Sequence, residues 1–403
     1  MKQIEGGVCA AAGFTAAGVY CGIRKNKTKK DLALIASEKR AACACVYTQN
    51  LVKGAPIAVT KRNVADGYAS AIICNSGNAN TCNANGVEIA ETMCDLLGKA
   101  LGIPAFDVVV ASTGVIGKPL SIEPIAGGIP SLIESLGDDS DGAARAIMTT
   151  DVKKKEIAVE FSVGGTTCKI GGIAKGSGMI QPNMATMLGF ITTDAAINPA
   201  MLQKALSSDV PESFNMVSID GDTSTNDMVT ILANGMAGNE EIAEAGADFD
   251  SFCAALGMVT QYLSRAIAGD GEGASKLLIC AVSGAAGKGD AKKLAKSVIN
   301  SPLVKCAMFG ADANWGRVLC ALGYAGVAVD VNKVGVRFSS AAGEIEVCKN
   351  GMGVDFSEEL AKAVLSESEI TIAVTLGDGD ASATAFGCDL TYDYVKINGD
   401  YRT

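Results

Sequence analysis

Residues 173–190 read IAKGSGMIQPNMATMLGF, and the expected chemistry of the chain starts here. A glycine-rich run leads through Pro182 and a small residue to Thr186, and a strand-like apolar run, 187–191, follows. By itself this pattern fits a surface loop between two strands. A phosphate-binding loop is disfavoured, because the Gly-x-x-x-x-Gly-Lys-Ser/Thr spacing is missing.

Thr186 stands between Ala185 and the head of a strand, which permits a second interpretation. If a turn holds the Ala185 carbonyl close to the Thr186 hydroxyl, the hydroxyl can attack it. The peptide becomes an ester, water cleaves the ester, and Thr186 becomes a new N-terminus. A free α-amino group ordinarily has a pKa of about 7.7–8.0, so the new amine can serve as the base for its own hydroxyl.

The chain contains no histidine, which narrows the chemistry further. Nucleophilic machinery of the Ser-His-Asp or Cys-His type is therefore excluded. A nucleophile must take its base from a carboxylate, a lysine or a chain-terminal amine.

Composition bounds the class of protein. The 403 residues have room for two or three domains of about 100–200 residues each. A formal charge of −10 argues against a nucleic-acid partner, because phosphate recognition needs a concentrated basic face. Neither a leader-like segment nor an apolar run of about 18 residues occurs, so we expect a cytoplasmic protein without a membrane partner.

Fourteen cysteines need an explanation in a reducing compartment. Cys74, Cys280 and Cys320 lie in apolar runs, where a free cysteine behaves as a small hydrophobic residue. The pair Cys43 and Cys45 has no second paired cluster, so no zinc site is expected. We expect no metal and no bound cofactor.

Short apolar runs alternate with amphipathic stretches, which predicts a mixed α/β (α+β) protein. Strands are expected at 71–74, 108–111, 156–163, 277–282, 326–329 and 369–375. Helices are expected at 86–101, 131–145, 199–206, 249–268, 291–300 and 357–366, the first of them capped by the asparagines of 83–85. Glycines at 284–289 suggest a boundary between a core of about 1–285 and a C-terminal α/β domain of about 286–403.

Motifs along nearly the whole chain carry a resemblance to a known family. They read GFTAAG (13–18), NSGNAN (75–80), STGVIG (112–117), MTTD (148–151), KGSGMI (175–180), PNMATML (182–188), DGEGASK (270–276), NWGR (314–317) and INGDYRT (397–403). On these motifs the chain resembles the ornithine acetyltransferase family, also called glutamate N-acetyltransferase, of the cyclic arginine pathway. Two features depart from the family pattern: Asp312-Ala313 where a proline is expected before Asn314, and a high cysteine content.

The resemblance implies self-cleavage between Ala185 and Thr186, giving fragments 1–185 and 186–403. Thr186 then takes the acetyl group from N2-acetylornithine and passes it to glutamate in a ping-pong exchange. The core motifs leave open whether acetyl-CoA is a second acetyl donor.

The resemblance also implies roles for individual residues. Thr113 and Gly114 correspond to the oxyanion hole of the family, although a strand-end turn fits the local sequence equally well. The substrate-contacting positions of the family fall on Thr149, Lys175, Thr186, Glu272, Asn398 and Thr403. We hypothesise that Lys175 faces a substrate carboxylate and that Glu272 faces an amino group.

The fold implied by the resemblance is a four-layer αββα sandwich like that of N-terminal-nucleophile hydrolases, followed by the smaller domain. The two cleavage fragments are expected to pair as a heterodimer and to assemble as a dimer of heterodimers.

Two other functions stay open on the sequence. One is a related aminopeptidase or amidase with an N-terminal threonine or serine, which shares the Thr186 chemistry but should lack the Lys175, Glu272 and Asn398–Thr403 set. The other is a non-catalytic ligand-binding protein that uses its glycine loops for nucleotides.

Overall fold

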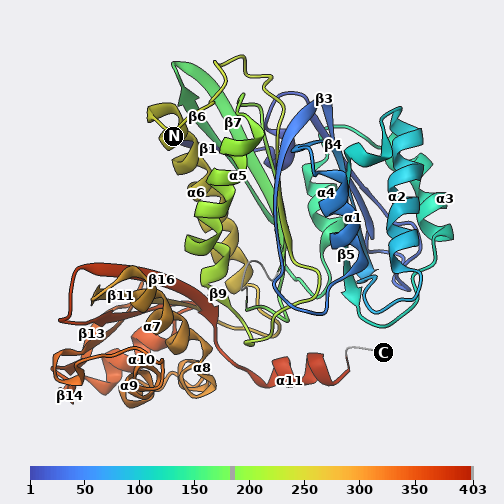
Figure 1. Ribbon diagram of the computed structural model, residues 1–403. Coiled ribbons are helices and arrows are strands. Elements are labelled where there is room, and N and C mark those ends of the chain that lie inside the picture. Colours follow the sequence, from blue (N-terminus) through green and yellow to red (C-terminus); the bar gives the residue numbers. More distant parts are fainter. Residues whose placement is uncertain (182–186, 401–403) are drawn as a thin grey trace. The chain divides into compact units, whose positions relative to one another are not determined.

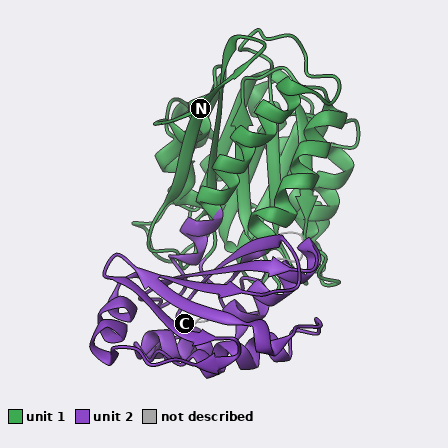
Figure 2. Cartoon of the chain, turned by 90° about the vertical axis from the view of Figure 1, so that its left-hand side faces the viewer, with its two compact units in different colours: residues 1–176, 182–215, 223–263 green, residues 177–181, 216–222, 264–403 purple. Residues whose placement is uncertain are grey.

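The computed structural model describes residues 1–181 and 187–400 (Figure 1). The chain divides into two compact units (Figure 2). Unit 1 comprises residues 1–176, 182–215 and 223–263, and unit 2 comprises residues 177–181, 216–222 and 264–403. Each unit has its own sheet.

Unit 1 is built on a mixed sheet of nine strands in the order β1-β6-β7-β8-β10-β3-β4-β5, with β2 paired to β3. The strands are β1 (Lys2–Ile4), β2 (Phe14–Val19), β3 (Leu32–Tyr47), β4 (Tyr68–Asn78), β5 (Val108–Val115), β6 (Lys155–Val163), β7 (Thr166–Lys175), β8 (Leu188–Thr193) and β10 (Met228–Ala233). The pairs β4/β5 and β8/β10 are parallel, and the other pairs are antiparallel.

The long strand β3 belongs to two parts of this sheet. Its first half pairs with β2 and β4, and its second half pairs with β10. Between the halves the register shifts, and exposed charged residues, 38–40, interrupt the buried pattern. Arg40 lies in this interruption and donates to Asp107 at 2.8 Å, which gives the charged bend a partner.

Six helices of unit 1 pack against its sheet, α1 to α5 on the part that contains β2–β5 and α6 on β6 and β7. They are α1 (Ala55–Asn63), α2 (Gly86–Leu101), α3 (Glu123–Glu134), α4 (Ser140–Ile147), α5 (Pro199–Asp209) and the first part of α6 (Ala247–Ala268). Alternation along the strands divides the apolar side chains between two cores. Ile72 and Cys74 of β4 join α4 in one core, whereas Ile73 joins α2 and α3 in the other.

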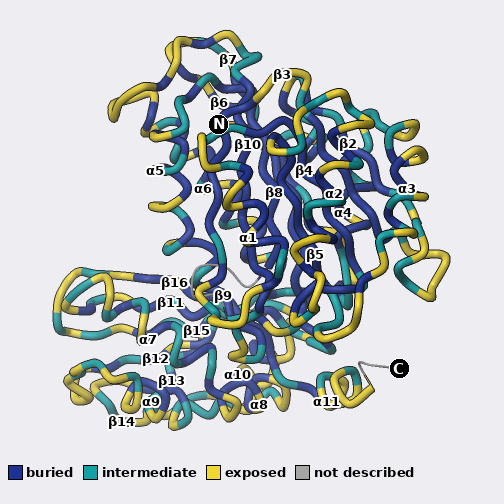
Figure 3. Tube along the Cα trace, turned by 45° about the vertical axis from the view of Figure 1, so that its right-hand side comes forward, coloured by how far each residue is buried: buried dark blue, intermediate teal, exposed yellow. Residues whose placement is uncertain are grey.

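The centre of the sheet is buried along its length. Every residue of β8 and β10 is buried, as Figure 3 shows. A strand that is buried on both faces reads as a continuous apolar run and not as an alternating one.

Unit 2 has a sheet of seven strands in the order β14-β13-β12-β15-β11-β16-β9. The strands are β9 (Val217–Ser218), β11 (Leu277–Ala285), β12 (Gly335–Ser340), β13 (Gly343–Lys349), β14 (Met352–Gly353), β15 (Glu369–Thr375) and β16 (Ala381–Cys388). The helices are α7 (Lys288–Asn300), α8 (Pro302–Phe309), α9 (Trp315–Gly323), α10 (Glu358–Ser366) and α11 (Tyr392–Gly399).

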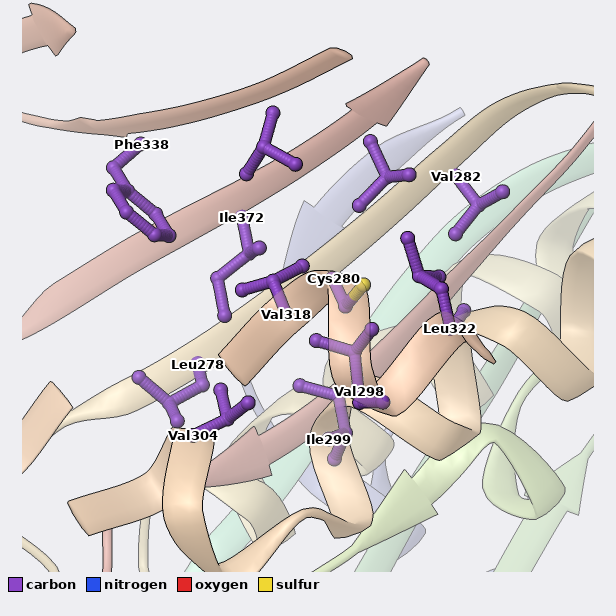
Figure 4. Close-up of a cluster of buried hydrophobic side chains, with 14 of the residues drawn as sticks. Leu278, Cys280, Val282, Val298, Ile299, Val304, Val318, Leu322, Phe338 and Ile372 are labelled. Carbon is purple, nitrogen blue, oxygen red and sulfur yellow. The ribbon is translucent and has the colours of Figure 1, made fainter. Parts of the chain in front are cut away.

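Aliphatic side chains of β11, β15 and the helices α7 to α9 form the core of unit 2. Figure 4 shows Leu278, Cys280 and Val282 of β11 meeting Val298 of α7 and Ile372 of β15. Cys280 is fully buried among them and acts as a small hydrophobic residue, as the sequence predicts.

The predicted mixed α/β class is confirmed, and the helix 86–101 and the strand 369–375 have the predicted bounds. The predicted helix 131–145 is wrong. It is two helices, α3 and α4, because Gly137 and Asp138 break it and Asp139 caps α4 by accepting the Gly142 N–H at 2.8 Å.

Three further expectations need correction. Residues 326–329 are irregular and not a strand, since Val327 and Val329 pack on the core without a partner strand. Asn85 stands at the N-cap of α2, but its side chain makes no capping hydrogen bond. Cys320 is exposed, because it lies on the outward side of α9.

Within residues 1–181 and 187–400, no helix combines the length and the apolar character that a membrane crossing requires. All fourteen cysteines are free thiols.

Adjacent glycines in α3 give a test of the packing. A Cβ on Gly128 would lie 2.4 Å from the Cys21 Cβ, whereas a Cβ on Gly127 would meet nothing within 4 Å. We expect Gly128→Ala to lower the free energy of unfolding by about 1–3 kcal/mol through overpacking. Gly127→Ala should raise it by about 0.5–1 kcal/mol, because alanine favours the helix. Urea unfolding of both variants checks this, and equal shifts for the two would contradict the packing.

Candidate active site

Thr113 and Gly114, the predicted oxyanion-hole residues, lie where the parallel strands β4 and β5 end. The two strands run in register from Ala71 opposite Val108, and the register breaks at Gly77 and Asn78. Carboxyl ends of parallel strands are a common place for binding groups in α/β sheets.

Only glycine fits at position 114. Its φ is 132°, and a Cβ there would lie 2.4 Å from the Gly77 carbonyl carbon and 2.5 Å from the Asn78 nitrogen. The close approach of the two backbones therefore fixes the peptide between Thr113 and Gly114 at the end of the sheet.

The Thr113 side chain is uncommitted within the described part of the chain. It is 9% exposed, and no residue among 1–181 and 187–400 hydrogen-bonds its hydroxyl. Its neighbour Ser112 behaves differently, since it donates to the Asn75 side chain at 2.5 Å. The Thr113 hydroxyl therefore keeps a donor and an acceptor capacity that no described residue uses.

Lys175 ends β7 on the same core as Thr113. Ile173 and Ala111 belong to one buried cluster, and Lys175 and Thr113 follow them by two positions, so strand alternation directs both toward that cluster. Burial raises the pKa of the Cys74 thiol in β4 to about 12, and the nearby charges of Lys175 and Arg24 oppose the rise. The Lys175 ammonium is thus within electrostatic reach of β4.

A buried carboxylate, Asp151, organises the region around Lys175. Its Oδ1 accepts the Lys155 ammonium and the Gly176 N–H, both at 2.7 Å, and its Oδ2 accepts the Thr149 N–H at 2.9 Å. One side chain therefore holds the predicted substrate residue Thr149 and the backbone beside Lys175.

Charge keeps Asp151 ionised in this buried position. Burial opposes ionisation, but the positive charges of Lys175 and Lys155 and the hydrogen bonds hold the pKa of that carboxyl well below its usual range. Lys155 is satisfied by the pair, whereas Lys175, 7% exposed, forms neither a hydrogen bond nor an ion pair with any residue of the described ranges.

The sheet also fixes the position of β8, the strand that follows the expected cleavage point. Leu188, two positions after Thr186, pairs with Lys175 on one side and with Met228 on the other. Ala185 and Thr186 themselves, and Thr403, lie outside the described residues.

Glu272 and Asn398 meet in unit 2. The Asn398 Nδ2 donates to the Glu272 Oε2 at 2.8 Å, and the Glu272 N–H donates to the Ser177 carbonyl at 2.7 Å. A Cβ on Gly178 would lie 2.4 Å from the Glu272 carboxyl carbon, so the glycine lets the main chain pass directly beside this carboxylate. Two predicted substrate residues are thus brought together.

Two cavities lie away from all these residues. One, of about 570 Å³ in unit 1, is lined by α1, the two residues before it and part of the segment 80–87, among them Lys53, Lys61 and Cys82. The other, of about 490 Å³ in unit 2, is lined by Ser339, Glu367 and their neighbours.

Sequence reasoning missed the residues that act through the backbone. Asp151 is the last residue of the MTTD motif at 148–151, and this motif could have indicated it as a site residue. Asp220, which accepts the Met179 and Ile180 N–H groups at 2.6 Å and 2.8 Å, stands in an ordinary stretch that gave no signal.

Comparison with known proteins gives matches along the whole chain. The model of the ArgJ family matches residues 15–403. The arginine biosynthesis bifunctional protein ArgJ of Caldanaerobacter subterraneus subsp. tengcongensis is 49% identical over 405 residues, covering 100% of both chains. The protein of the same name from Symbiobacterium thermophilum is 50% identical over 406 residues, again covering 100% of both chains.

A solved structure matches as well. The crystal structure of the arginine biosynthesis bifunctional protein argJ from Bacillus halodurans is 45% identical, with a TM-score of 0.50. The match covers 97% of that solved chain but 52% of the present one, so the solved chain is about half as long.

Asp151 provides a test of the buried charge cluster. Asp151→Asn leaves two buried ammonium groups without their counter-charge, and we expect a loss of about 3–5 kcal/mol in the free energy of unfolding at pH 7. The folded pKa lies below the unfolded value of about 3.9, so the loss is fully present at neutral pH and shrinks as the pH falls below about 4.

Urea unfolding between pH 3 and pH 7 measures this difference. Asp141→Asn is the matched control, because Asp141 pairs with Arg145 and Lys154 at the surface and should contribute about 1 kcal/mol or less. A difference for Asp151→Asn that grows as the pH falls would contradict the assignment.

Proposed function

The chain belongs to the ArgJ family, and from that premise we propose that it is a self-cleaving acetyltransferase whose nucleophile is Thr186. It is an enzyme of arginine biosynthesis, a glutamate N-acetyltransferase, which moves the acetyl group of N2-acetylornithine to glutamate. The observation that carries this function is identity of 49–50% over the full length of two arginine biosynthesis bifunctional proteins.

Self-cleavage between Ala185 and Thr186 produces the nucleophile. The Thr186 hydroxyl attacks the Ala185 carbonyl, the acyl group passes from nitrogen to oxygen, and water hydrolyses the ester. The products are a carboxylate at Ala185 and a free amine on Thr186. Two observations support this step: the chain has no histidine to activate a hydroxyl, and the solved relative is a chain of about half this length.

Acetyl transfer then follows in two halves. The Thr186 amine removes the proton of its own hydroxyl, the oxygen attacks the acetyl carbon of N2-acetylornithine, and ornithine leaves with the proton. Glutamate attacks the acetyl-threonine ester through its amino group, which gives N-acetylglutamate and restores the hydroxyl. Each half passes through a tetrahedral oxyanion.

Thr113 and Gly114 stabilise that oxyanion in this proposal. Support comes from the uncommitted Thr113 hydroxyl and from the backbone approach that permits glycine alone at 114. Loss of one donor of this kind typically lowers the rate by about 100- to 1000-fold.

Lys175 binds a substrate carboxylate in this proposal. Lys175 is 7% exposed and forms no ion pair in the described ranges, although the Asp151 charge is near enough to act on it, so a bound carboxylate would give the ammonium a direct ionic hydrogen bond. Thr149 lies beside it through Asp151, and Glu272 with Asn398 offers acceptors for a substrate amino group. Thr403 is assigned to the substrate by family resemblance alone.

We further propose the assembly and location that the family resemblance implies. Fragments 1–185 and 186–403 stay together as a heterodimer, two heterodimers form a tetramer, and the enzyme works in the cytoplasm without cofactor or metal. Native mass spectrometry measures the assembly.

The cleavage proposal predicts two bands on a denaturing gel. Fragments 1–185 and 186–403 should appear for the wild type, and Thr186→Ala should give one uncut band without acetyl transfer. Thr167→Ala, at an exposed threonine of β7, should cleave normally.

Incubation with labelled N2-acetylornithine and glutamate distinguishes acetyl transfer from hydrolysis. A separate incubation with labelled acetyl-CoA shows whether the enzyme uses one acetyl donor or two. Transfer by an uncut chain would reject the mechanism.

Lys175→Met tests the substrate carboxylate. Loss of an ionic hydrogen bond should raise the KM for glutamate roughly 10- to 100-fold, measured on protein already shown by gel to be cleaved. Lys169→Met, at a half-buried lysine of the same strand, is the matched control. An unchanged KM in Lys175→Met would remove this residue from the binding site.

A further inference from the structure

A second carboxylate, Asp220, contacts two segments that are far apart in the sequence. Its Oδ2 accepts the Met179 N–H at 2.6 Å and its Oδ1 accepts the Ile180 N–H at 2.8 Å. The Tyr394 hydroxyl of α11 reaches the same Oδ2 at 3.3 Å. Residues 177–181, Asp220 and α11 all belong to unit 2.

The first segment has a backbone that needs support. Met179 has a φ of 55°, in the left-handed region that a residue with a side chain seldom adopts. Its side chain is 42% exposed, so packing does not impose this conformation. Bonds from two successive N–H groups to one carboxylate do impose it, because charge-assisted hydrogen bonds are the strong ones.

The second segment is equally dependent on a few contacts. None of the residues 392–399 of α11 is buried, and an isolated helix of this length is unstable in water. Its described anchors are the Tyr394 hydroxyl on Asp220, the Asn398 amide on Glu272 at 2.8 Å, and the ring of Tyr392 against Phe309.

We propose that Asp220 is a positioning residue for the reaction, a role that rests on the proposed function. Through Met179 and Ile180 it holds the backbone of the described residues 177–181, which precede the expected cleavage point in the sequence. Through Tyr394 it sets α11, and with it Asn398 beside Glu272. One carboxylate thereby links the segment that leads to self-cleavage with the segment that binds substrate.

Two variants separate these roles. Asp220→Asn offers one acceptor oxygen where the carboxylate offers two, so at least one of the Met179 and Ile180 bonds is lost. Tyr394→Phe removes the hydroxyl alone and leaves both amide bonds. Asp222→Asn makes the same charge change two positions away, on an exposed side chain without a hydrogen bond in the described ranges.

Cleavage is followed by gel after cell-free synthesis, and kinetics are measured on the cleaved fraction. We expect Asp220→Asn to cleave about tenfold more slowly and to show a KM for N2-acetylornithine raised about tenfold, with kcat changed much less. Tyr394→Phe should cleave at the wild-type rate and show the raised KM. Asp222→Asn should match the wild type.

Amide hydrogen exchange reads the same contacts without any activity. In Asp220→Asn, exchange should accelerate in peptides covering 177–181 and 392–399, and in Tyr394→Phe in 392–399 alone. Acceleration spread over all of unit 2 would mean a merely structural role and would overturn the proposal. So would a folded Asp220→Asn with wild-type cleavage and KM.

Two remaining outcomes are also decisive. If Asp220→Asn does not fold, Tyr394→Phe decides: an unchanged KM with unchanged exchange in 392–399 refutes the link. If the wild type never cleaves, the proposed function fails, while the exchange measurements still test whether Asp220 holds the two segments.

Discussion

The arrangement of the candidate site in unit 1 depends on one buried ion pair. Asp151 and Lys155 lie 2.7 Å apart with almost no exposed side-chain area, and Asp151 also accepts backbone N–H groups from Thr149 and Gly176. A buried charge is tolerated only when it is paired and fully hydrogen-bonded, so these partners have little freedom to move. Lys175 lies near this cluster as a second cation, and its positive charge also acts on the Asp151 carboxylate.

The ends of β4 and β5 obey a different constraint, which is steric. Gly114 lets β5 approach β4 so closely that a methyl group at position 114 would collide with the backbone of Gly77 and Asn78. Ionic hydrogen bonds therefore position Thr149 and Gly176, and close backbone packing positions Thr113 and Gly114. Both act before any substrate arrives, which is the preorganisation that stabilising a transition-state charge requires.

Part of this architecture can be predicted from the sequence, and the reasons for the remainder are physical. The helix 86–101 and the strand 369–375 show clear periodicity, which predicts both with correct bounds. Strand β3 is not predicted. Its two halves are buried on both faces, so apolar and polar residues do not alternate along them, and the charged residues 38–40 interrupt the run. Thr113, Lys175 and Glu272 are found through motifs, whereas Asp220 acts on backbone groups, and backbone groups leave no trace in a sequence pattern.

The position of β8 in the sheet has a consequence for the folding of the enzyme. β8 lies between β7 and β10, and with a chain break after Ala185 its two neighbours come from different polypeptides. The uncut precursor folds as a unimolecular reaction, at a rate independent of concentration. Once unfolded and diluted, the two mature fragments must first associate, because the peptide bond that gave them a high effective concentration has been cleaved. Cleavage therefore makes refolding of the mature enzyme depend on protein concentration, whereas folding of the precursor does not.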